Sequence, residues 1–328
     1  MSRTSDEKRP LFDLRSFGRR ASPTARIRLS PDEIAAIDRT VRRAPEVMVK
    51  VLPTGNSDPK SAARHLNYIG RDGERELELD DGARVKGTHA GEQLVEDWDL
   101  DLDLHRKDQD IASVKGRSPK LVHKIVLSMP AGASSKGVLQ AARVFASEEF
   151  GLKHRYALVI HTDEPHPHVH LVVKAVSERG QRLNISPATL RSWRQKFASH
   201  LRDLGIAANA TDRAVRGKTR TNKSDPMYRA QRRGDSSHVR ARIQSVVADM
   251  RRGALRVEPG KATLVRTRKD VEASWSTLAE TLAAQGHPRL ADEIWRWVSE
   301  LPPPRTEREV LADSILKKAS AVREGPAR

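Results

Sequence analysis

The chain has 328 residues, with 60 lysines and arginines against 43 aspartates and glutamates, which gives a formal net charge of +17. It contains no cysteine, and this excludes disulfides, thiolate zinc sites and cysteine nucleophiles. Hydrophobic residues make up 37% of the sequence, the mean hydropathy is −0.63, and no apolar run is long enough to cross a bilayer. We therefore expect a cytoplasmic protein without membrane insertion. Its excess positive charge favours a polyanionic partner such as nucleic acid, because neutralised phosphates release counterions.

The first elements follow from capping residues and alternation. Residues 1–43 predict a flexible basic N-terminal arm with one short helix, which Ser30 caps and Pro31 begins. Alternating valines predict a strand over 45–53, because every second side chain of a strand points to the same face. A helix is expected over 57–73, where glycines end it.

The middle of the chain carries clearer patterns. An Asp-Gly turn predicts a hairpin over 75–85, whereas the acidic stretch 86–118 is expected to be irregular. Beyond it, periodicity predicts strands from 121, over 154–162 and over 166–176. Capping residues predict two helices, one over 134–151 capped by Ser134 or Ser135 and one over 184–205 capped by Ser186. Hairpins alternating with single helices predict an α+β fold, an antiparallel sheet with helices packed on it.

The pattern divides the chain into four predicted regions. The flexible basic arm over 1–43 precedes the main α+β domain over 44–210. A basic arm over 211–242 follows, in which residues 213–242 hold ten lysines and arginines and two acidic residues. This charge predicts that the second arm binds DNA phosphates. The remainder, 243–328, predicts a small helical C-terminal region.

Histidines gather in the stretch HTDEPHPHVHLVV, residues 161–173, where four stand within ten positions. Side chains alternate across a strand, so one face carries three of them: His166, His168 and His170. Antiparallel pairing across a short turn would set His161 opposite His168, and His161, His168 and His170 could then hold one metal ion with positions left open. Asp163 could orient an imidazole or accept a proton.

Other interpretations of this cluster remain. The histidines could be exposed residues on a polar sheet face, and His166 could equally be a phosphate donor or a solvated neighbour. The run HPHVHLVV also fits the histidine-triad pattern of metal-independent nucleotide hydrolases, but that family has no need of so basic a chain. Imidazoles suit zinc or manganese while phosphate chemistry commonly runs on magnesium, and we expect Mg²⁺ or Mn²⁺.

The chain has three tyrosines, and each has a different expected role. Tyr156 alternates with apolar residues on the strand face away from His161, which predicts core packing. Tyr228 lies in the basic arm, where an aromatic ring could stack on a base. Tyr68 ends a helix beside Arg71 and is followed by glycines that allow close approach. It is the candidate nucleophile, because a polarised phosphate and a carboxylate base would compensate for a weakly nucleophilic phenol.

The pair HLNYIGRDG and HTDEPHPHVHLVV resembles the tyrosine motif and the His-x-Asp…His-hydrophobe-His motif of conjugative relaxases. These are the single-tyrosine mobilisation nucleases of the HUH endonuclease superfamily, including the border endonucleases that process transferred DNA. The similarity covers roughly residues 45–225 and includes the segment ANATDRAVRGKTR. It implies that 44–210 is a HUH relaxase catalytic domain and that the chain nicks DNA at an origin of transfer.

The resemblance also implies a role for each matching residue. Tyr68 would attack the scissile phosphate of single-stranded DNA, forming a 5′-phosphotyrosine link and releasing a 3′-hydroxyl. Asp163 would accept a proton or orient a histidine, and Ser128 falls near the family's serine-bearing middle motif. A divalent ion would be held by His161, His168 and His170. Contacts to the DNA are expected from Arg71, His166, Arg191, Arg194, Arg216, Lys218, Arg220 and Tyr228.

Relaxases as a family act with accessory relaxosome proteins, a coupling ATPase and a type IV secretion system, so the resemblance implies these partners. It also implies translocation with the DNA from a bacterial cytoplasm into a recipient cell. A rolling-circle replication initiator is an alternative with the same chemistry, although many such initiators use two neighbouring tyrosines. A non-catalytic basic DNA-binding protein is the other alternative. Tyr68→Phe separates the last case, because only a nuclease should lose cleavage while keeping binding.

Overall fold

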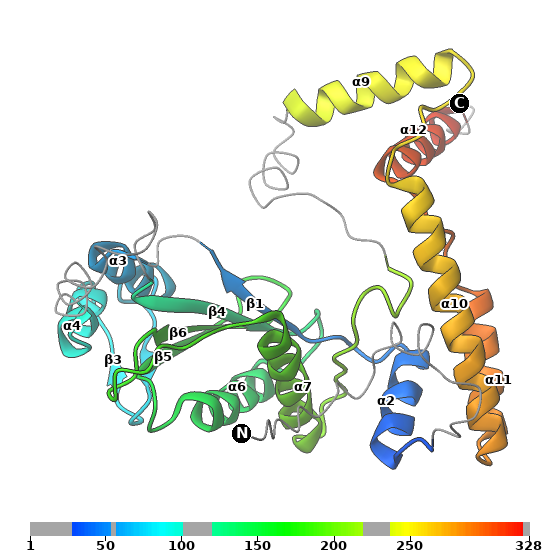
Figure 1. The fold of residues 1–328 in the computed structure, drawn as a ribbon. Helices are drawn as coiled ribbons and strands as arrows, with labels where there is room; N and C mark the ends of the chain where they lie inside the picture. Colours follow the sequence, from blue (N-terminus) through cyan, green and yellow to red (C-terminus); the bar gives the residue numbers. More distant parts are fainter. Residues whose placement is uncertain (1–27, 54–56, 101–119, 219–236, 324–328) are drawn as a thin grey trace, which may run out of the picture. The chain divides into compact units, whose positions relative to one another are not determined.

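Figure 1 shows the computed structural model, which describes residues 28–53, 57–100, 120–218 and 237–323. The chain divides into two compact units, one of Arg43–Ala210 and the other of Met1–Arg42 together with Thr211–Arg328. Among the described helices, none combines the length and the hydrophobicity that a membrane span requires.

A six-stranded antiparallel sheet forms the centre of the Arg43–Ala210 unit. Its strands are β1 (Met48–Leu52), β2 (Leu77–Leu79), β3 (Arg84–Val85), β4 (Val122–Ser128), β5 (Tyr156–His161) and β6 (His168–Lys174). They lie in the order β1-β4-β6-β5-β2-β3, and each neighbouring pair is antiparallel. The predicted α+β fold with an antiparallel sheet is confirmed, as is the predicted hairpin, which β2 and β3 form.

The helices of this unit are α3 (Pro59–Ile69), α4 (Ala90–Asp97), α6 (Ser135–Phe150) and α7 (Pro187–Asp203). Two of them, α6 and α7, begin where the capping residues predict. The hydroxyl of Ser134 accepts the backbone N–H of Gly137, and the hydroxyl of Ser186 accepts that of Thr189. Each bond satisfies a donor that the first turn of a helix would leave unpaired. The predictions for α6 and α7 are therefore confirmed, with Ser134 as the cap of α6.

The prediction that residues 86–118 are irregular is wrong for the part that forms α4. This helix begins at His89, which makes no side-chain capping bond, so the usual start signal is missing from the sequence. Its stability comes from burial instead, because Leu94, Val95 and Trp98 pack into one core with Leu66 of α3. Residues 101–118 of this stretch lie outside the described residues.

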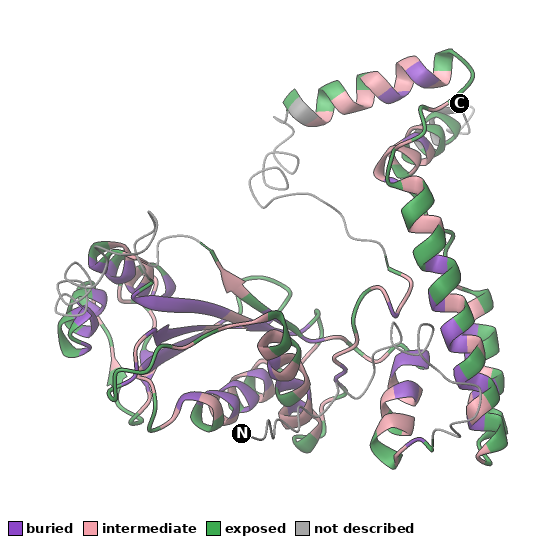
Figure 2. Ribbon diagram, viewed as in Figure 1, coloured by how far each residue is buried: buried purple, intermediate pink, exposed green. Residues whose placement is uncertain are grey.

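The two faces of the sheet pack against different helices. On one face, α6 and α7 cover the strands, and aromatic rings such as Phe145 and Trp193 meet edge to face with centroids 6.0 Å apart. On the other face, α3 and α4 cover Ala157, Val159 and Val172. Figure 2 shows that the central strands are mostly buried. Helices therefore lie on both faces of the sheet, because each face carries apolar side chains.

The second unit is helical. It contains α2 (Pro31–Val41), α9 (Ser237–Arg251), α10 (Lys261–Ala284), α11 (Pro288–Ser299) and α12 (Glu307–Arg323). The rings of Trp275 and Trp297 lie 4.8 Å apart at their centroids and join α10 to α11 in a shared core. Ser30 and Glu33 form a capping box at the start of α2, and Pro31 occupies its first turn, as the sequence predicts.

Residues 28–42 belong to this helical unit. The described part of the predicted N-terminal arm is therefore packed and not a flexible arm. Leu29, Ile37 and Val41 are buried in the same core as Trp275, and burial of these apolar groups holds α2 against the helices. Part of the predicted second arm also packs on this helical unit. The indole N–H of Trp275 donates to the carbonyl of Val215 at 2.9 Å.

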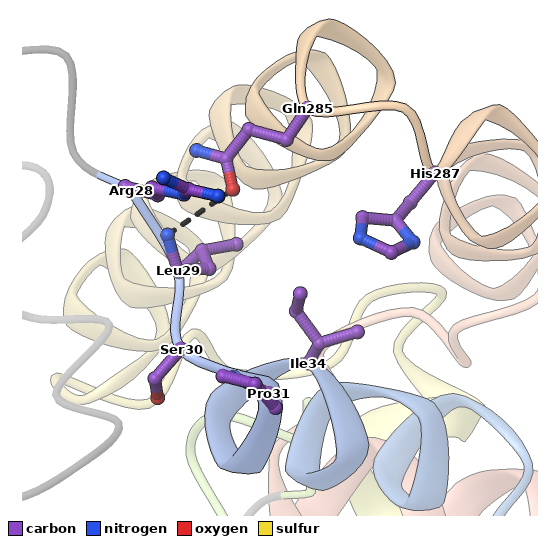
Figure 3. A pocket seen from close by; sticks show the side chains of 7 residues that line it. All are labelled: Arg28, Leu29, Ser30, Pro31, Ile34, Gln285 and His287. Carbon is purple, nitrogen blue, oxygen red and sulfur yellow. Dashed lines mark hydrogen bonds between the residues drawn. The ribbon is translucent and has the colours of Figure 1, made fainter.

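A hollow lies between the start of α2 and the turn that joins α10 to α11. Figure 3 shows its lining, which consists of Arg28, Leu29, Ser30, Pro31, Ile34, Gln285 and His287. The backbone N–H of Leu29 donates to Oε1 of Gln285 at 3.1 Å and ties the chain before α2 to the end of α10. The hollow shares no residue with the histidine cluster of β5 and β6.

Candidate active site

Three histidines converge on the sheet face that α3 and α4 partly cover. His161 of β5 pairs with His168 of β6, and His170 pairs with Val159, which is the predicted register. One ring nitrogen from each of His161, His168 and His170 lies within 4.8 Å of the others. Three imidazole nitrogens at this separation fit a divalent ion with coordination positions left for water or phosphate.

Hydrogen bonds set which nitrogen each ring could offer to a metal. Nε2 of His161 lies 2.7 Å from the carbonyl of Ile69, and Nδ1 of His168 lies 3.0 Å from the carbonyl of His166. If these nitrogens carry the protons, Nδ1 of His161 and Nε2 of His168 are left as acceptors. In the described part of the chain, the buried Nδ1 of His170 has no hydrogen-bond partner.

Two histidines of the cluster, His161 and His170, have lowered pKa values, which favours the neutral form that binds a cation. Burial, followed by the neighbouring histidines, lowers the pKa of His170 to about 3. Burial also lowers the pKa of His161. Metal ligation requires an unprotonated nitrogen, so these low values favour a metal over a proton at the cluster.

Tyr68 lies next to the cluster at the end of α3. Its side chain is exposed, at 57% of its maximum area, and its ring is stacked on His65 with centroids 6.3 Å apart. His65 in turn meets His170 edge-on at 6.3 Å. His65 was not among the predicted site residues, although it stands three positions before Tyr68 and therefore shares its face of the helix.

A tight turn after α3 carries Arg71, whose backbone is left-handed with φ of 52°. The Arg71 guanidinium forms an ion pair with the carboxylate of Asp163 and lies 5.9 Å from the centroid of the Tyr68 ring. A bond from its own backbone amide, together with the charge of Arg71, lowers the pKa of Asp163. Asp163 is therefore ionised, and its carboxylate pairs with a guanidinium instead of orienting an imidazole.

Of the remaining predicted residues, His166, Arg191 and Arg194 belong to the same unit as the cluster. The ring of His166 is exposed in the turn before β6. Arg191 and Arg194 lie on α7, which covers the opposite face of the sheet. Arg216 and Lys218 belong to the helical unit. The last two predicted contacts, Arg220 and Tyr228, lie outside the described residues.

Fold and cluster together bring the two motifs of the sequence resemblance into one site, where a strand pair presents histidines beside a tyrosine-bearing helix. Residues 68–206 match the family model described as Relaxase, MobA/VirD2-like, nuclease domain. This match agrees with the resemblance to relaxases seen in the sequence.

Individual relatives agree with this assignment. The T-DNA border endonuclease VirD2 of Rhizobium radiobacter is 28% identical over 192 residues, 52% of this chain and 43% of the relative. VirD2 of Agrobacterium fabrum (strain C58) is 27% identical over 216 residues, 60% of this chain and 46% of the relative. The chain therefore matches less than half the length of these curated relatives.

Two solved structures are also similar. One is the MobM relaxase domain bound to plasmid pMV158 oriT DNA in a Mn-bound crystal structure, with 9% identity, a TM-score of 0.36 and coverage of 57% of this chain and 98% of that chain. The other is described as the molecular basis of vancomycin resistance transfer in Staphylococcus aureus, with 12% identity, a TM-score of 0.34 and coverage of 51% and 98%.

Proposed function

We propose that this protein is a DNA relaxase that nicks one strand at an origin of transfer by tyrosine transesterification. The observation that carries the proposal is the row of rings from Tyr68 through His65 to His170, which sets an exposed phenol beside three convergent imidazoles. An exposed tyrosine is accessible to a polymeric substrate such as single-stranded DNA. The match to a relaxase nuclease domain supports the same assignment.

In the proposed reaction, the phenol oxygen of Tyr68 attacks the scissile phosphorus and the bond from phosphorus to the 3′-oxygen breaks. The products are a 5′-phosphotyrosine link and a free 3′-hydroxyl, which takes up a proton. His161, His168 and His170 would hold a divalent ion, Mg²⁺ or Mn²⁺, which supplies charge to polarise the phosphate oxygens. One phosphodiester is exchanged for another, so the reverse attack can reseal the strand without ATP.

The phenol proton needs an acceptor, and Asp163 is the proposed one. Its ion-pair partner Arg71 lies beside the Tyr68 ring, and the charge of Arg71 helps to lower the pKa of Asp163. Arg71 would also contact the DNA backbone, since a guanidinium matches phosphate geometry. We propose contacts to the DNA likewise for the other predicted residues, with base stacking as the role of Tyr228: His166, Arg191, Arg194, Arg216, Lys218, Arg220 and Tyr228.

The alternative of a rolling-circle initiator with two nucleophiles receives less support. Tyr156 is 5% exposed and packs in the core with Phe150 on the face opposite the histidines. It is therefore remote from any substrate at the cluster, which leaves Tyr68 as the one tyrosine of the described residues that a strand could reach. Single-tyrosine chemistry favours strand transfer, with relaxosome proteins, a coupling ATPase and a type IV secretion system as the proposed partners in a bacterial cytoplasm.

A covalent-adduct assay tests the proposal. Wild type, Tyr68→Phe and the matched control Tyr156→Phe are mixed with single-stranded DNA covering the host element's candidate origin, with Mg²⁺ or Mn²⁺, then denatured and run on a gel. We expect an adduct with wild type and Tyr156→Phe, none with Tyr68→Phe, and none after chelation. An adduct that survives Tyr68→Phe would refute the assignment of the nucleophile. Tight DNA binding without any adduct would favour the non-catalytic alternative.

A further inference from the structure

Lys124 of β4 occupies the same sheet face as the histidines. It pairs with Val172 of β6, while Val126, two residues along β4, pairs with His170. Lys124 and His170 are therefore diagonal neighbours across two strands, a relation that places such residues roughly 7–8 Å apart. Lys124 is only 5% exposed, which is unusual because lysine is almost never fully buried without a partner.

Within the residues that the structure describes, no anion balances this charge. The strands β1, β4, β5 and β6 contain no acidic residue, and in the described part of the chain no carboxylate forms an ion pair with Lys124. Its charged neighbour is the exposed Arg64 on α3, a second cation. Burial, followed by the charge of Arg64, lowers the pKa of Lys124 to about 8, while burial and the charge of Lys124 lower the pKa of His65 to about 4.

The other deeply buried cations of the described residues have partners. Lys174 of β6 is also 5% exposed and lies on the same sheet face as Lys124. It forms an ion pair with Glu178 at 3.3 Å. Arg268, 7% exposed, donates to the carbonyls of Pro302 and Gly217 at 2.6 and 2.5 Å. Burying a charge without a partner costs free energy, so Lys124 departs from the arrangement found elsewhere in the chain.

We propose that Lys124 is a positioning residue that binds a phosphate of the substrate strand next to the scissile one. The inference rests on the proposed function, in which the strand lies across this face with its scissile phosphate at the histidines. Arg64 and Lys50 add positive charge near Lys124, since Arg64 is its charged neighbour and Lys50 lies diagonal to it on β1. A phosphate held there fixes the register of the strand, and thus which phosphate faces Tyr68.

The test measures charge coupling between Lys124 and single phosphates. Oligonucleotides of the transfer origin, each with one neutral methylphosphonate near the nick, are bound to the full chain in the Tyr68→Phe background and in the Tyr68→Phe/Lys124→Met double variant. Methionine keeps the length of the lysine stem without its charge. Lys174→Met is the matched control, because it removes an equally buried lysine that already has a counter-ion.

We expect one methylphosphonate position to weaken binding about tenfold when Lys124 is present and to have no further effect when Lys124 is methionine. The salt dependence of binding, as a log–log slope, should fall by about 0.7 on loss of this one contact, and Lys124→Arg should restore it. Lys174→Met should leave both measurements unchanged. Unfolding midpoints of all variants, measured alongside, show whether each one is folded.

A Lys124→Met protein with the affinity and salt slope of its parent would overturn the inference, as would equal losses at every methylphosphonate position in both backgrounds. These results are distinct from failure of the proposed function. In that case the wild-type chain forms no adduct at all, whereas here the adduct forms and only the role of Lys124 is refuted.

Discussion

The two faces of the sheet in the Arg43–Ala210 unit bury side chains in opposite ways. On the face beneath α6 and α7, the strands contribute apolar residues such as Ile125, Leu127 and Leu171. Buried aromatic rings of the two helices pack against them. On the other face, apolar packing is limited to the part under α3 and α4, and the rest carries three histidines and Lys124. The first arrangement maximises stability, whereas the second leaves polar groups with incomplete partners where a ligand would bind.

The comparison predicts that substitutions on the two faces have separate effects. Phe145→Ala, on the apolar face, should lower the free energy of unfolding by about 3–5 kcal/mol, because Phe145 is fully buried against Phe150, Trp193 and Phe197. His168→Ala, on the other face, should change it by less than about 1 kcal/mol but reduce nicking more than about 100-fold. Urea unfolding and the adduct assay on the same preparations measure both.

A His168→Ala protein with retained metal-dependent nicking would remove His168 from the proposed ligand set. A Phe145→Ala protein that loses nicking per folded molecule would contradict the separation of the two faces, because α6 and α7 would then influence the site.

Sequence patterns predicted those parts of the fold that depend on neighbours along the chain. Alternation located the strands, and side-chain caps located α6 and α7. The turn between β5 and β6 is short, so its length sufficed to predict that His161 faces His168. The histidine cluster was therefore predictable, since antiparallel pairing follows from a short turn.

Contacts between distant segments were not predictable from the same patterns. The start of α4 lacks a capping side chain, and its stability depends on burial against α3. His65 and Lys124 gain their significance only where α3 meets the sheet. Similarly, charge alone cannot tell on which face a helix packs, so Arg191 and Arg194 were predicted as DNA contacts although α7 lies on the face opposite the histidines.

Arg71 offers a second test, because it combines an ion pair with an unfavourable backbone. Its φ of 52° suits glycine, so Arg71→Gly should be more stable than Arg71→Ala by about 1 kcal/mol. Both variants lose the ion pair with Asp163, and both should nick roughly 10-fold more slowly, since Asp163 loses the guanidinium that holds it near Tyr68. Nicking by Arg71→Gly at the wild-type rate would show that the backbone turn, not the guanidinium, matters for the reaction.

The smallest predicted effect concerns the pH dependence of stability. The pKa of Lys124 is about 8 in the folded chain against 10.5 for an ordinary lysine, with Arg64 and His65 of α3 facing it. Between these values the unfolded chain binds a proton that the folded chain has released, so this residue makes the fold more stable as the pH rises. Lys124→Met should therefore be more stable than wild type at pH 7 by about 1–2 kcal/mol, and this advantage should disappear near pH 10.5.

Urea unfolding of wild type and Lys124→Met at a series of pH values measures this difference directly, and Lys174→Met controls for the loss of a buried lysine from the same sheet face. A difference that stays constant from pH 7 to pH 10.5 would show that Lys124 pays no desolvation cost in the free protein. The site would then lack the unbalanced charge from which phosphate binding is inferred. The two faces of the sheet would still differ in shape and chemistry, but not in how completely their buried polar groups find partners.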